Sequence, residues 1–263
     1  MWMLVQIVLS LAVLLQGGAV APPASPPSNA KVWIGHYDEY ERYLLTAPIE
    51  RYETTKVGVT RPKHAFFAPG GLAQGATVKN LPPRQQRGFF ESYKSEIAAY
   101  KLDRLLELDM VPPTIEREID GDRVSVQLWV EGTKTIKEVQ QQKLRASNTE
   151  AWNREIYRQR VFDNLVANID SNAGNLLIDR DWHIIKIDHS RCFATSKMPF
   201  PMTRIDRPFY KHLQALDEAT VTSALGDLLE RGGVTSLMQR RDDIVKTFQK
   251  LIDKQGEAKV LIP

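Results

Sequence analysis

The sequence predicts an α+β fold with two lobes, in which a strand-rich first half leads into a helical second half. Two observations support this prediction. Short strand-like segments broken by Gly and Pro gather between residues 50 and 81, and the chain beyond residue 208 has apolar residues at helical spacing. Strands followed by helices are typical of α+β domains, and a cleft between the two parts is expected.

The composition restricts the class of protein. Of the 263 residues, 43% are hydrophobic and 25% are charged, which excludes a wholly disordered chain. Only one stretch lacks charge for long enough to cross a membrane, so a multi-span membrane protein is excluded as well. The net charge is +3 with both signs interspersed, and we therefore expect no nucleic-acid partner. The single cysteine, Cys192, excludes an intramolecular disulfide, and its apolar neighbour Phe193 indicates burial.

The N-terminus resembles a targeting segment. Met3–Leu15 is an apolar run, and it is followed by small residues that end in Ala19-Val20-Ala21. This pattern predicts a cleaved secretory signal over residues 1–21, hence a secreted, periplasmic or lumenal domain. No Lys or Arg precedes the run, so a single uncleaved membrane anchor and a start assigned too far upstream are the alternatives. The Pro- and Ser-rich residues 22–37 predict a flexible linker.

The first lobe is expected over residues 38–130. The patterns predict three strands, at Arg51–Val57, His64–Ala68 and Gln74–Leu81. Apolar residues at helical spacing predict a helix over Phe90–Leu108, which Pro112-Pro113 prevents from continuing. A hairpin of Thr114–Ile119 and Arg123–Val130 then follows around an Asp-Gly-Asp turn.

The second lobe is expected over residues 131–263. Ser147 and Glu150 form a capping-box pattern that opens a second long helix. Two short apolar strands follow, at Asn175–Asp179 and His183–Asp188. The remaining apolar periodicity predicts helices at Leu213–Leu216, Val221–Leu229 and Leu237–Ile252.

Three polar residues around the small hairpin have a spacing that indicates chemistry. Asn175 follows Asp170 by five residues, and Asp188 follows Asn175 by thirteen. Phosphoryl transfer from ATP needs a carboxylate beside the incoming hydroxyl and oxygen ligands for magnesium, and protein kinases supply them from residues in this order. The spacing predicts Asp170 as the catalytic carboxylate and Asn175 and Asp188 as Mg²⁺ ligands. The alternative is a plain polar turn, because Asp, Asn and Gly are common turn formers.

The segment ESYKSEIAAYKLDRLLELDMVPPT, together with the Asp170-x-x-x-x-Asn175 loop, resembles the atypical branch of the protein-kinase fold. That branch includes HipA-type kinases, phosphatidylinositol 3- and 4-kinase-like domains and secretory-pathway kinases related to Golgi casein kinase. The similarity is closest to uncharacterised bacterial members and runs from about Glu50 to Asp253. It implies a β-rich N-lobe, a helical C-lobe, and ATP with Mg²⁺ or Mn²⁺ in the cleft between them.

The resemblance also implies a set of nucleotide-binding residues in the N-lobe. Lys79, in the third predicted strand, would hold the phosphates, and Glu96, 17 residues later, would hold Lys79. Gly58 and Thr60 would belong to a phosphate-covering loop, which here has one glycine where kinases have three. Trp129, at the end of the larger hairpin, would line the adenine site.

Several readings remain open beside this one. Lys94 is a rival phosphate lysine, although its helical position favours solvent, and His189 is either a supporting group beside Asp188 or an ordinary loop residue. The residues before Asp170 are not His-Arg, and Asp188 is followed by His-Ser instead of Phe-Gly. The acceptor hydroxyl could belong to a protein Ser or Thr, a lipid or a small molecule. A nucleotide-binding pseudokinase scaffold and an AMP transferase are the alternative functions.

Overall fold

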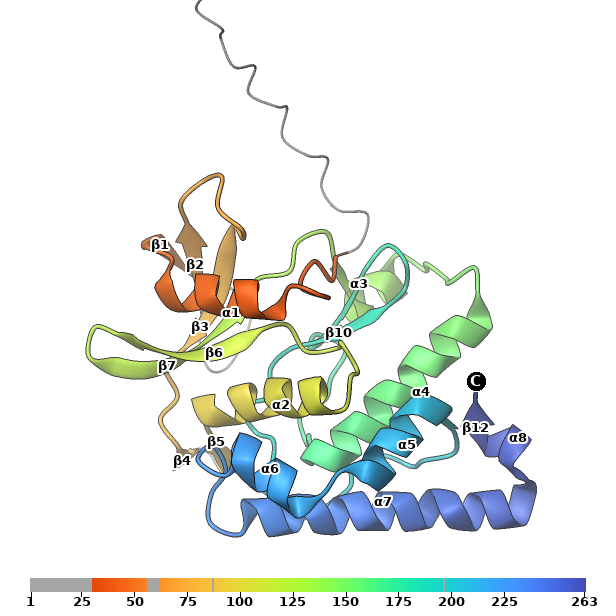
Figure 1. Ribbon diagram of the computed structural model, residues 1–263. Helices are drawn as coiled ribbons and strands as arrows, with labels where there is room; N and C mark the ends of the chain where they lie inside the picture. Colours follow the sequence, from red (N-terminus) through yellow and green to blue (C-terminus); the bar gives the residue numbers. More distant parts are fainter. Residues whose placement is uncertain (1–29, 56–61, 87, 196) are drawn as a thin grey trace, which may run out of the picture.

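A five-stranded antiparallel sheet forms the first half of the chain, and a group of helices forms the second (Figure 1). The computed structural model describes residues 30–55, 62–86, 88–195 and 197–263. The strand order of the sheet is β1-β2-β3-β7-β6. Its strands are β1 (Ile49–Thr54), β2 (Lys63–Phe67), β3 (Gly75–Lys79), β6 (Thr114–Ile119) and β7 (Asp122–Leu128). This arrangement confirms the α+β class that the sequence predicted.

Alternation along the strands gives the sheet two different faces. Ala76 and Val78 of β3 lie in a hydrophobic core that also takes up Leu44 of α1 (Tyr37–Thr46). Because successive side chains of a strand point to opposite faces, Gly75, Thr77 and Lys79 lie on the other face. That face contacts α2 (Tyr93–Leu105) where it meets β6 and β7. Lys79 therefore faces a helix instead of solvent.

The folded part of the chain begins earlier than the sequence suggested. Trp33 is completely buried and packs with the core beneath α1, and Lys31 is buried as well. Both residues fall within the segment 22–37 that was predicted as a linker. The signal or anchor segment, residues 1–21, lies outside the described residues, and so does the linker as far as residue 29.

α2 begins three residues later than the predicted helix. Ser92 is its N-cap, and the Ser92 hydroxyl accepts a hydrogen bond from the backbone N–H of Lys94 at 3.1 Å. The residues just before it form a short hairpin of β4 (Arg84–Gln86) and β5 (Phe89–Glu91), which the sequence did not predict. The predicted apolar stripe of the helix is buried in the core of the second lobe, so α2 is anchored to both lobes.

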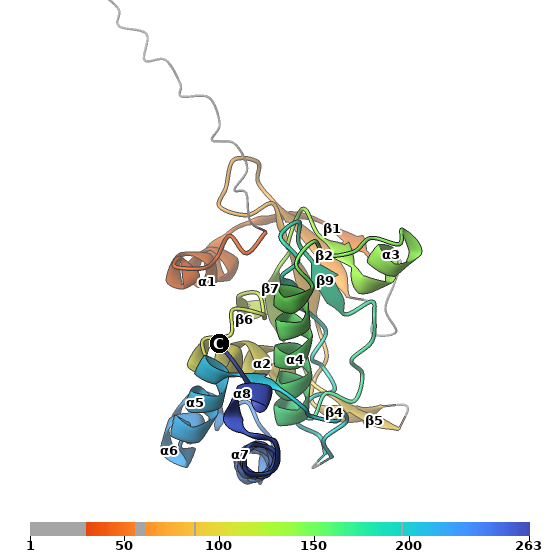
Figure 2. The same ribbon diagram turned by 90° about the vertical axis from the view of Figure 1, so that its right-hand side faces the viewer.

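The second lobe surrounds two long helices, α4 (Thr149–Val166) and α7 (Gly233–Gln255), which pack against each other (Figures 1 and 2). The N-cap of α4 is Asn148, whose side chain accepts from Ala151, so the capping box predicted at Ser147 is wrong. Cys192 is buried in the core of this lobe, as predicted. The remaining elements are α3 (Ile136–Gln141), α5 (Arg207–Ala215), α6 (Glu218–Leu225), α8 (Glu257–Val260), and the parallel pair β11 (Ile205–Asp206) and β12 (Leu261–Ile262).

A small sheet connects the two lobes. β9 (Leu176–Ile178) pairs with β10 (Ile184–Lys186) and with β8 (Lys134–Thr135), which gives the order β10-β9-β8. Ile185 of β10 packs into the core of the first lobe, whereas Ile184 packs with residues of α3 and α4. The hairpin is thereby fixed between the lobes, and the polar residues at its two ends lie at the boundary.

Within the described ranges, each helix is either too short or too polar to cross a lipid bilayer.

Candidate active site

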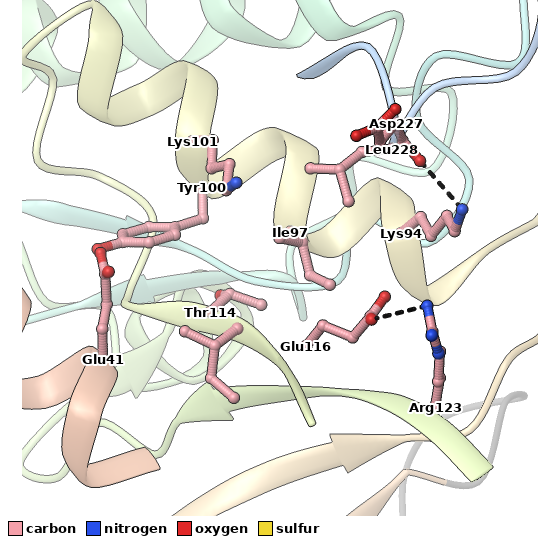
Figure 3. Close-up of a pocket in the computed structure, with 11 residues that line it drawn as sticks. Glu41, Lys94, Ile97, Tyr100, Lys101, Thr114, Glu116, Arg123, Asp227 and Leu228 are labelled. Atoms are coloured by element: carbon pink, nitrogen blue, oxygen red, sulfur yellow. Dashed lines mark hydrogen bonds and ion pairs between the residues drawn. The ribbon is translucent and has the colours of Figure 1, made fainter. Parts of the chain in front are cut away.

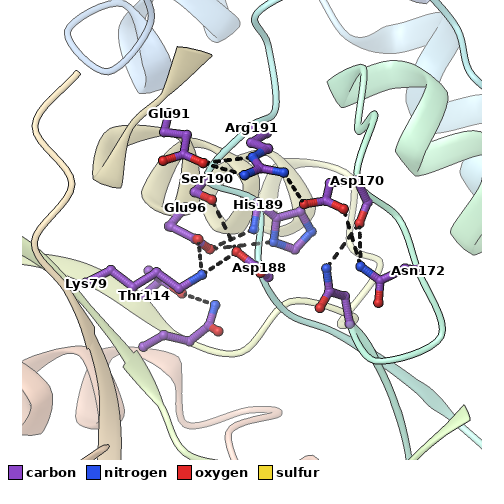
Figure 4. Close-up of polar contacts among 12 residues, drawn as sticks. Lys79, Glu91, Glu96, Thr114, Asp170, Asn172, Asp188, His189, Ser190 and Arg191 are labelled. Carbon is purple, nitrogen blue, oxygen red and sulfur yellow. Dashed lines mark hydrogen bonds and ion pairs between the residues drawn. The ribbon is translucent and has the colours of Figure 1, made fainter. Parts of the chain in front are cut away.

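A buried lysine stands between two carboxylates at the boundary of the lobes (Figure 4). Lys79 Nζ lies 2.5 Å from Glu96 Oε1 and 2.6 Å from Asp188 Oδ1. The side chains of Lys79 and Glu96 are 7% and 2% exposed, and that of Asp188 is 29% exposed. The three residues that the sequence assigned separately to phosphate, lysine support and metal therefore form one cluster.

Local structure explains how the three side chains meet. Glu96 lies in the first turn of α2, where the helix dipole favours a negative charge. Asp188 follows β10 with a left-handed backbone (φ 63°), which turns the chain sharply after the strand. The next backbone N–H, that of His189, donates to Glu96 Oε2 at 2.9 Å. Both carboxylates are thus held on one side of β3, the side that Lys79 faces.

Burial affects all three members of the cluster. It raises the pKa of Glu96, and the charge of Asp188 adds to the rise while the Lys79 ammonium opposes it. Burial acts to lower the pKa of Lys79, but Asp188 and Glu96 outweigh it and raise the pKa well above its usual value. Burial acts to raise the pKa of Asp188, and the Lys79 ammonium overcomes this, so that the pKa falls below its ordinary value. At neutral pH Lys79 is a cation and Asp188 an anion.

The charge of the cluster favours an additional cation. One ammonium faces the carboxylates of Glu96 and Asp188, so at a pH where both carboxylates are ionised the cluster carries one negative charge in a poorly solvated place. Asn175 adds an amide oxygen, because its Nδ2 donates to the backbone carbonyl of Asp170 at 3.1 Å and leaves Oδ1 for another partner. The backbone N–H of Ile187 donates to the backbone carbonyl of Asn175 at 3.1 Å. Because Ile187 directly precedes Asp188, this bond connects the chain segments of the two candidate ligands. Carboxylate and amide oxygens beside surplus negative charge fit Mg²⁺ or Mn²⁺.

Asp170 lies in a loop that fixes its own backbone. The N–H of Asp170 donates to Asn168 Oδ1 at 3.1 Å, and Asn172 and Asn175 both donate to the carbonyl of Asp170. Its carboxylate forms an ion pair with Arg191 at 2.9 Å and remains 38% exposed. A carboxylate that is fixed yet open to solvent is suited to accept a hydrogen bond from a hydroxyl group.

Solved structures of several kinases match the fold of this chain. No family model matches the chain, and no curated protein matches its sequence. The crystal structure of the Golgi casein kinase matches with TM-score 0.64 and 14% identity, over 86% of this chain and 77% of that chain. The same kinase with Mn/ADP bound matches with TM-score 0.64, 15% identity, and coverage of 86% and 78%.

Two further structures agree. Hydra Fam20 with sugar matches with TM-score 0.65 and 14% identity, over 86% of this chain and 92% of that chain. The Helicobacter pylori proinflammatory kinase CtkA matches with TM-score 0.51 and 12% identity, over 76% and 92%. The chain has an atypical protein-kinase-like fold. At these identities the likeness concerns the fold alone.

An aromatic stack lies on the face of the five-stranded sheet that also carries Lys79. The ring of Trp129 stacks on His64 with centroids 3.7 Å apart and planes at 12°, and His64 also contacts Phe66. Gly75 is required beneath this stack, because a Cβ at this position would lie 2.6 Å from His64 Nε2 and 2.5 Å from the carbonyl oxygen of Ala65. Trp129 is therefore on the same sheet face as Lys79, at the point where the chain leaves the N-lobe.

Three other residues that the sequence singled out have different outcomes. Gly58 and Thr60 lie outside the described residues. Lys94 is separate from the Lys79 cluster, and its Nζ donates to the backbone carbonyl of Asp227 at 3.0 Å. Lys94 lines a pocket of about 610 Å³ between α2 and β6 (Figure 3). None of the predicted catalytic or metal-binding residues lines this pocket, so the rival assignment for Lys94 is not supported.

The sequence missed a second buried ion pair, which supports the Asp170 loop. Lys186 Nζ lies 2.7 Å from Asp163 Oδ1, and both side chains are almost completely buried. Asp163 also accepts from Asn168 Nδ2 at 2.9 Å and from Ser171 Oγ at 2.7 Å, on either side of Asp170. A lysine within the apolar run of β10 was the signal for such a pair, because a buried lysine needs an anionic partner.

His189 is buried beside the cluster, and its two alternative interpretations stay open. Its ring is fully buried, and neither ring nitrogen has a hydrogen-bond partner among the described residues. Burial, and then the charges of Lys186 and Lys79, lower the pKa of His189 well below its usual value. The imidazole of His189 is therefore neutral, and its Nδ1 lies 3.9 Å from Glu96 Oε2.

Removing Lys186 should destabilise the protein strongly. Lys186→Met leaves the Asp163 carboxylate buried without its cation, and breaking a buried pair in this way costs about 3–5 kcal/mol. Urea denaturation should show this loss in the free energy of unfolding. Arg207→Met is the matched control, because Arg207 pairs with Glu257 on the surface, and it should cost at most about 1 kcal/mol. Equal losses in the two variants would show that the buried pair is unimportant.

Proposed function

We propose that this protein is an ATP-dependent phosphotransferase that uses Mg²⁺ or Mn²⁺ and transfers phosphate to a hydroxyl acceptor. The observation that supports the proposal most strongly is the buried cluster of Lys79, Glu96 and Asp188. A lysine on a sheet, a carboxylate on the adjoining helix and a carboxylate after the hairpin are the groups that phosphoryl transfer from ATP requires in kinases.

Lys79 contacts the nucleotide phosphates in this proposal. Its positive charge is permanent at neutral pH, and Glu96 fixes its position from the first turn of α2. Phosphate oxygens would replace Asp188 as the second anionic partner of Lys79, while the bond to Glu96 remains. The positioning of charge before the reaction is the main contribution that a protein makes to phosphoryl transfer.

Asn175 and Asp188 hold the divalent cation. The surplus negative charge of the cluster and the free Asn175 Oδ1 support this assignment, as does the Mn/ADP bound in the Golgi casein kinase structure. The bound cation supplies neutralisation of the phosphate charges. Asp188 already lies beside Lys79 without ligands, and it would give up this contact to the phosphate oxygens when it binds the cation.

Asp170 accepts the hydrogen bond, and then the proton, of the acceptor hydroxyl. Its exposed carboxylate and its fixed backbone support this role. Trp129, with His64, forms the apolar contact for the nucleotide base, and Gly58 and Thr60 cover the phosphates. The acceptor is a hydroxyl group on a protein, a lipid or a small molecule. Residues 1–21 direct the domain to a secretory compartment, or anchor it to a membrane.

Asp188→Ala should abolish the stabilisation of the protein by MgATP. The variant loses a metal ligand. It also loses one of two neighbouring carboxylates, which removes the repulsion between them, so the ligand-free protein should remain folded. Thermal shift of residues 31–263 with MgATP measures this, with Asp253→Ala, an exposed carboxylate on α7, as the control that keeps the shift. A full MgATP shift in folded Asp188→Ala would remove Asp188 from the metal site.

Asp170→Ala should eliminate transfer and spare MgATP binding, because Asp170 contacts the acceptor and not the nucleotide. Intact mass of casein incubated with MgATP reports transfer and distinguishes an added phosphoryl group from an adenylyl group, while thermal shift reports binding. Loss of both together would show that the role given to Asp170 is wrong. An adenylyl product from the unchanged protein would favour AMP transfer.

A further inference from the structure

A chain of ion pairs runs from the N-lobe to the catalytic loop (Figure 4). Arg191, three residues after Asp188, donates from Nε and Nη2 to Glu91 Oε1 at 2.8 and 2.6 Å. From its remaining nitrogen, Nη1, it donates to Asp170 Oδ2 at 2.9 Å. One guanidinium therefore connects β5 with the Asp170 carboxylate, which accepts the proton of the acceptor hydroxyl in the proposed reaction.

The N-lobe holds Arg191 more tightly than Asp170 does. Glu91 is 5% exposed and receives two of the three hydrogen bonds, and the guanidinium lies 4.4 Å from the ring centroid of Phe89. The backbone N–H of Ser92 also donates to the carbonyl of Ser190 at 2.9 Å. The β4–β5 hairpin and the start of α2 thus fix Arg191 in place. Arg191 in turn orients the carboxylate of Asp170.

The charge of Arg191 does not vary under ordinary conditions. Burial acts to lower the pKa of Arg191, but hydrogen bonding to Glu91 and the charge of Asp170 outweigh it and raise the pKa further. A planar guanidinium can contact two carboxylates in fixed directions, which an ammonium group cannot do. The geometry therefore depends on arginine and not only on positive charge.

The two oxygens of the Asp170 carboxylate have different contacts. Oδ2 is bound to Arg191, whereas among the described residues Oδ1 has only a long contact of 3.4 Å from Asn172 Nδ2. The backbone hydrogen bonds of the loop fix where Asp170 is, but they do not fix the rotation of its carboxylate. Arg191 fixes that rotation and leaves Oδ1 open for a hydroxyl group.

We propose that Arg191 is a positioning residue for Asp170 and that Glu91 holds Arg191 in the required place. The inference rests on the proposed phosphotransferase function. It makes the β4–β5 hairpin, which has no part in nucleotide contact in our proposal, a determinant of the transfer step. Displacement of the hairpin would slow transfer without changing the nucleotide site.

Arg191→Met and Glu91→Gln test the inference. We expect kcat for MgATP hydrolysis, in which water takes the place of the acceptor, to fall about tenfold to a hundredfold, because small misplacements of a reacting group have effects of this size. The KM for ATP and the MgATP thermal shift should not change. Transfer to casein should fall in parallel with hydrolysis.

The conservative and rescue variants separate positioning from folding. Arg191→Lys should be intermediate, because an ammonium cannot bridge both carboxylates, and Arg191→Ala should regain activity in dilute, non-denaturing guanidinium. In an Asp170→Ala background, Arg191→Met should have no further effect on kcat. Arg207→Met with its surface partner Glu257 is the matched control and should keep full activity.

Each contrary result has a defined meaning. Unchanged kcat in folded Arg191→Met and Glu91→Gln would overturn the inference, and so would a raised KM for ATP with normal kcat, which would place Arg191 at the nucleotide. Should Arg191→Met fail to fold, the near-isosteric Glu91→Gln still decides. Absence of both hydrolysis and transfer in the unchanged protein would instead contradict the proposed function.

Discussion

The interaction on which the site depends is the buried contact of Lys79 with two carboxylates. An isolated ammonium or carboxylate in this position would be costly, because charged groups lose their hydration on burial. The pair Lys79 and Glu96 compensate each other, and Asp188 adds a second carboxylate, which raises the pKa of Glu96. Two carboxylates therefore share one ammonium, and a further cation beside them would favour the ionised form of both.

This cluster requires that three separate parts of the chain be held together. β3 supplies the lysine, the first turn of α2 supplies Glu96, and the chain after β10 supplies Asp188. α2 packs into the C-lobe core while it contacts the N-lobe sheet, and Ile185 of β10 packs into the N-lobe core. These contacts across the boundary fix the lobes relative to each other without help from a ligand.

The sequence was sufficient to identify residues whose positions follow from local structure. Asp170, Asn175 and Asp188 lie at the ends of one short hairpin, so their spacing along the chain determines their proximity. Lys79 and Glu96 required one further assumption, that the third strand and the next helix are adjacent. The resemblance to kinases supplied this assumption, and the structure brings the two side chains together.

Other features were beyond the sequence because they depend on distant or competing contacts. Glu91 and Arg191 are a hundred residues apart, and each alone has the pattern of an ordinary surface charge. The β4–β5 hairpin has strands of only three residues each, which is too short for a pattern to indicate. Ser147 and Asn148 are equally good caps by residue type, and only the structure shows that the Asn148 side chain accepts from the backbone N–H of Ala151 in the first turn of α4. Trp33 is buried only because α1 and the sheet provide a site for it.

A double-mutant cycle of Lys79→Met and Glu96→Gln on MgATP affinity tests the central claim most directly. If Glu96 acts by placing Lys79, its removal should have little effect once Lys79 is absent, and the coupling energy should be about 0.5–3 kcal/mol. Lys94→Met, on another face of the same helix, should leave the affinity unchanged. A coupling energy near zero, or a loss of affinity in Lys94→Met as large as in Lys79→Met, would contradict the account.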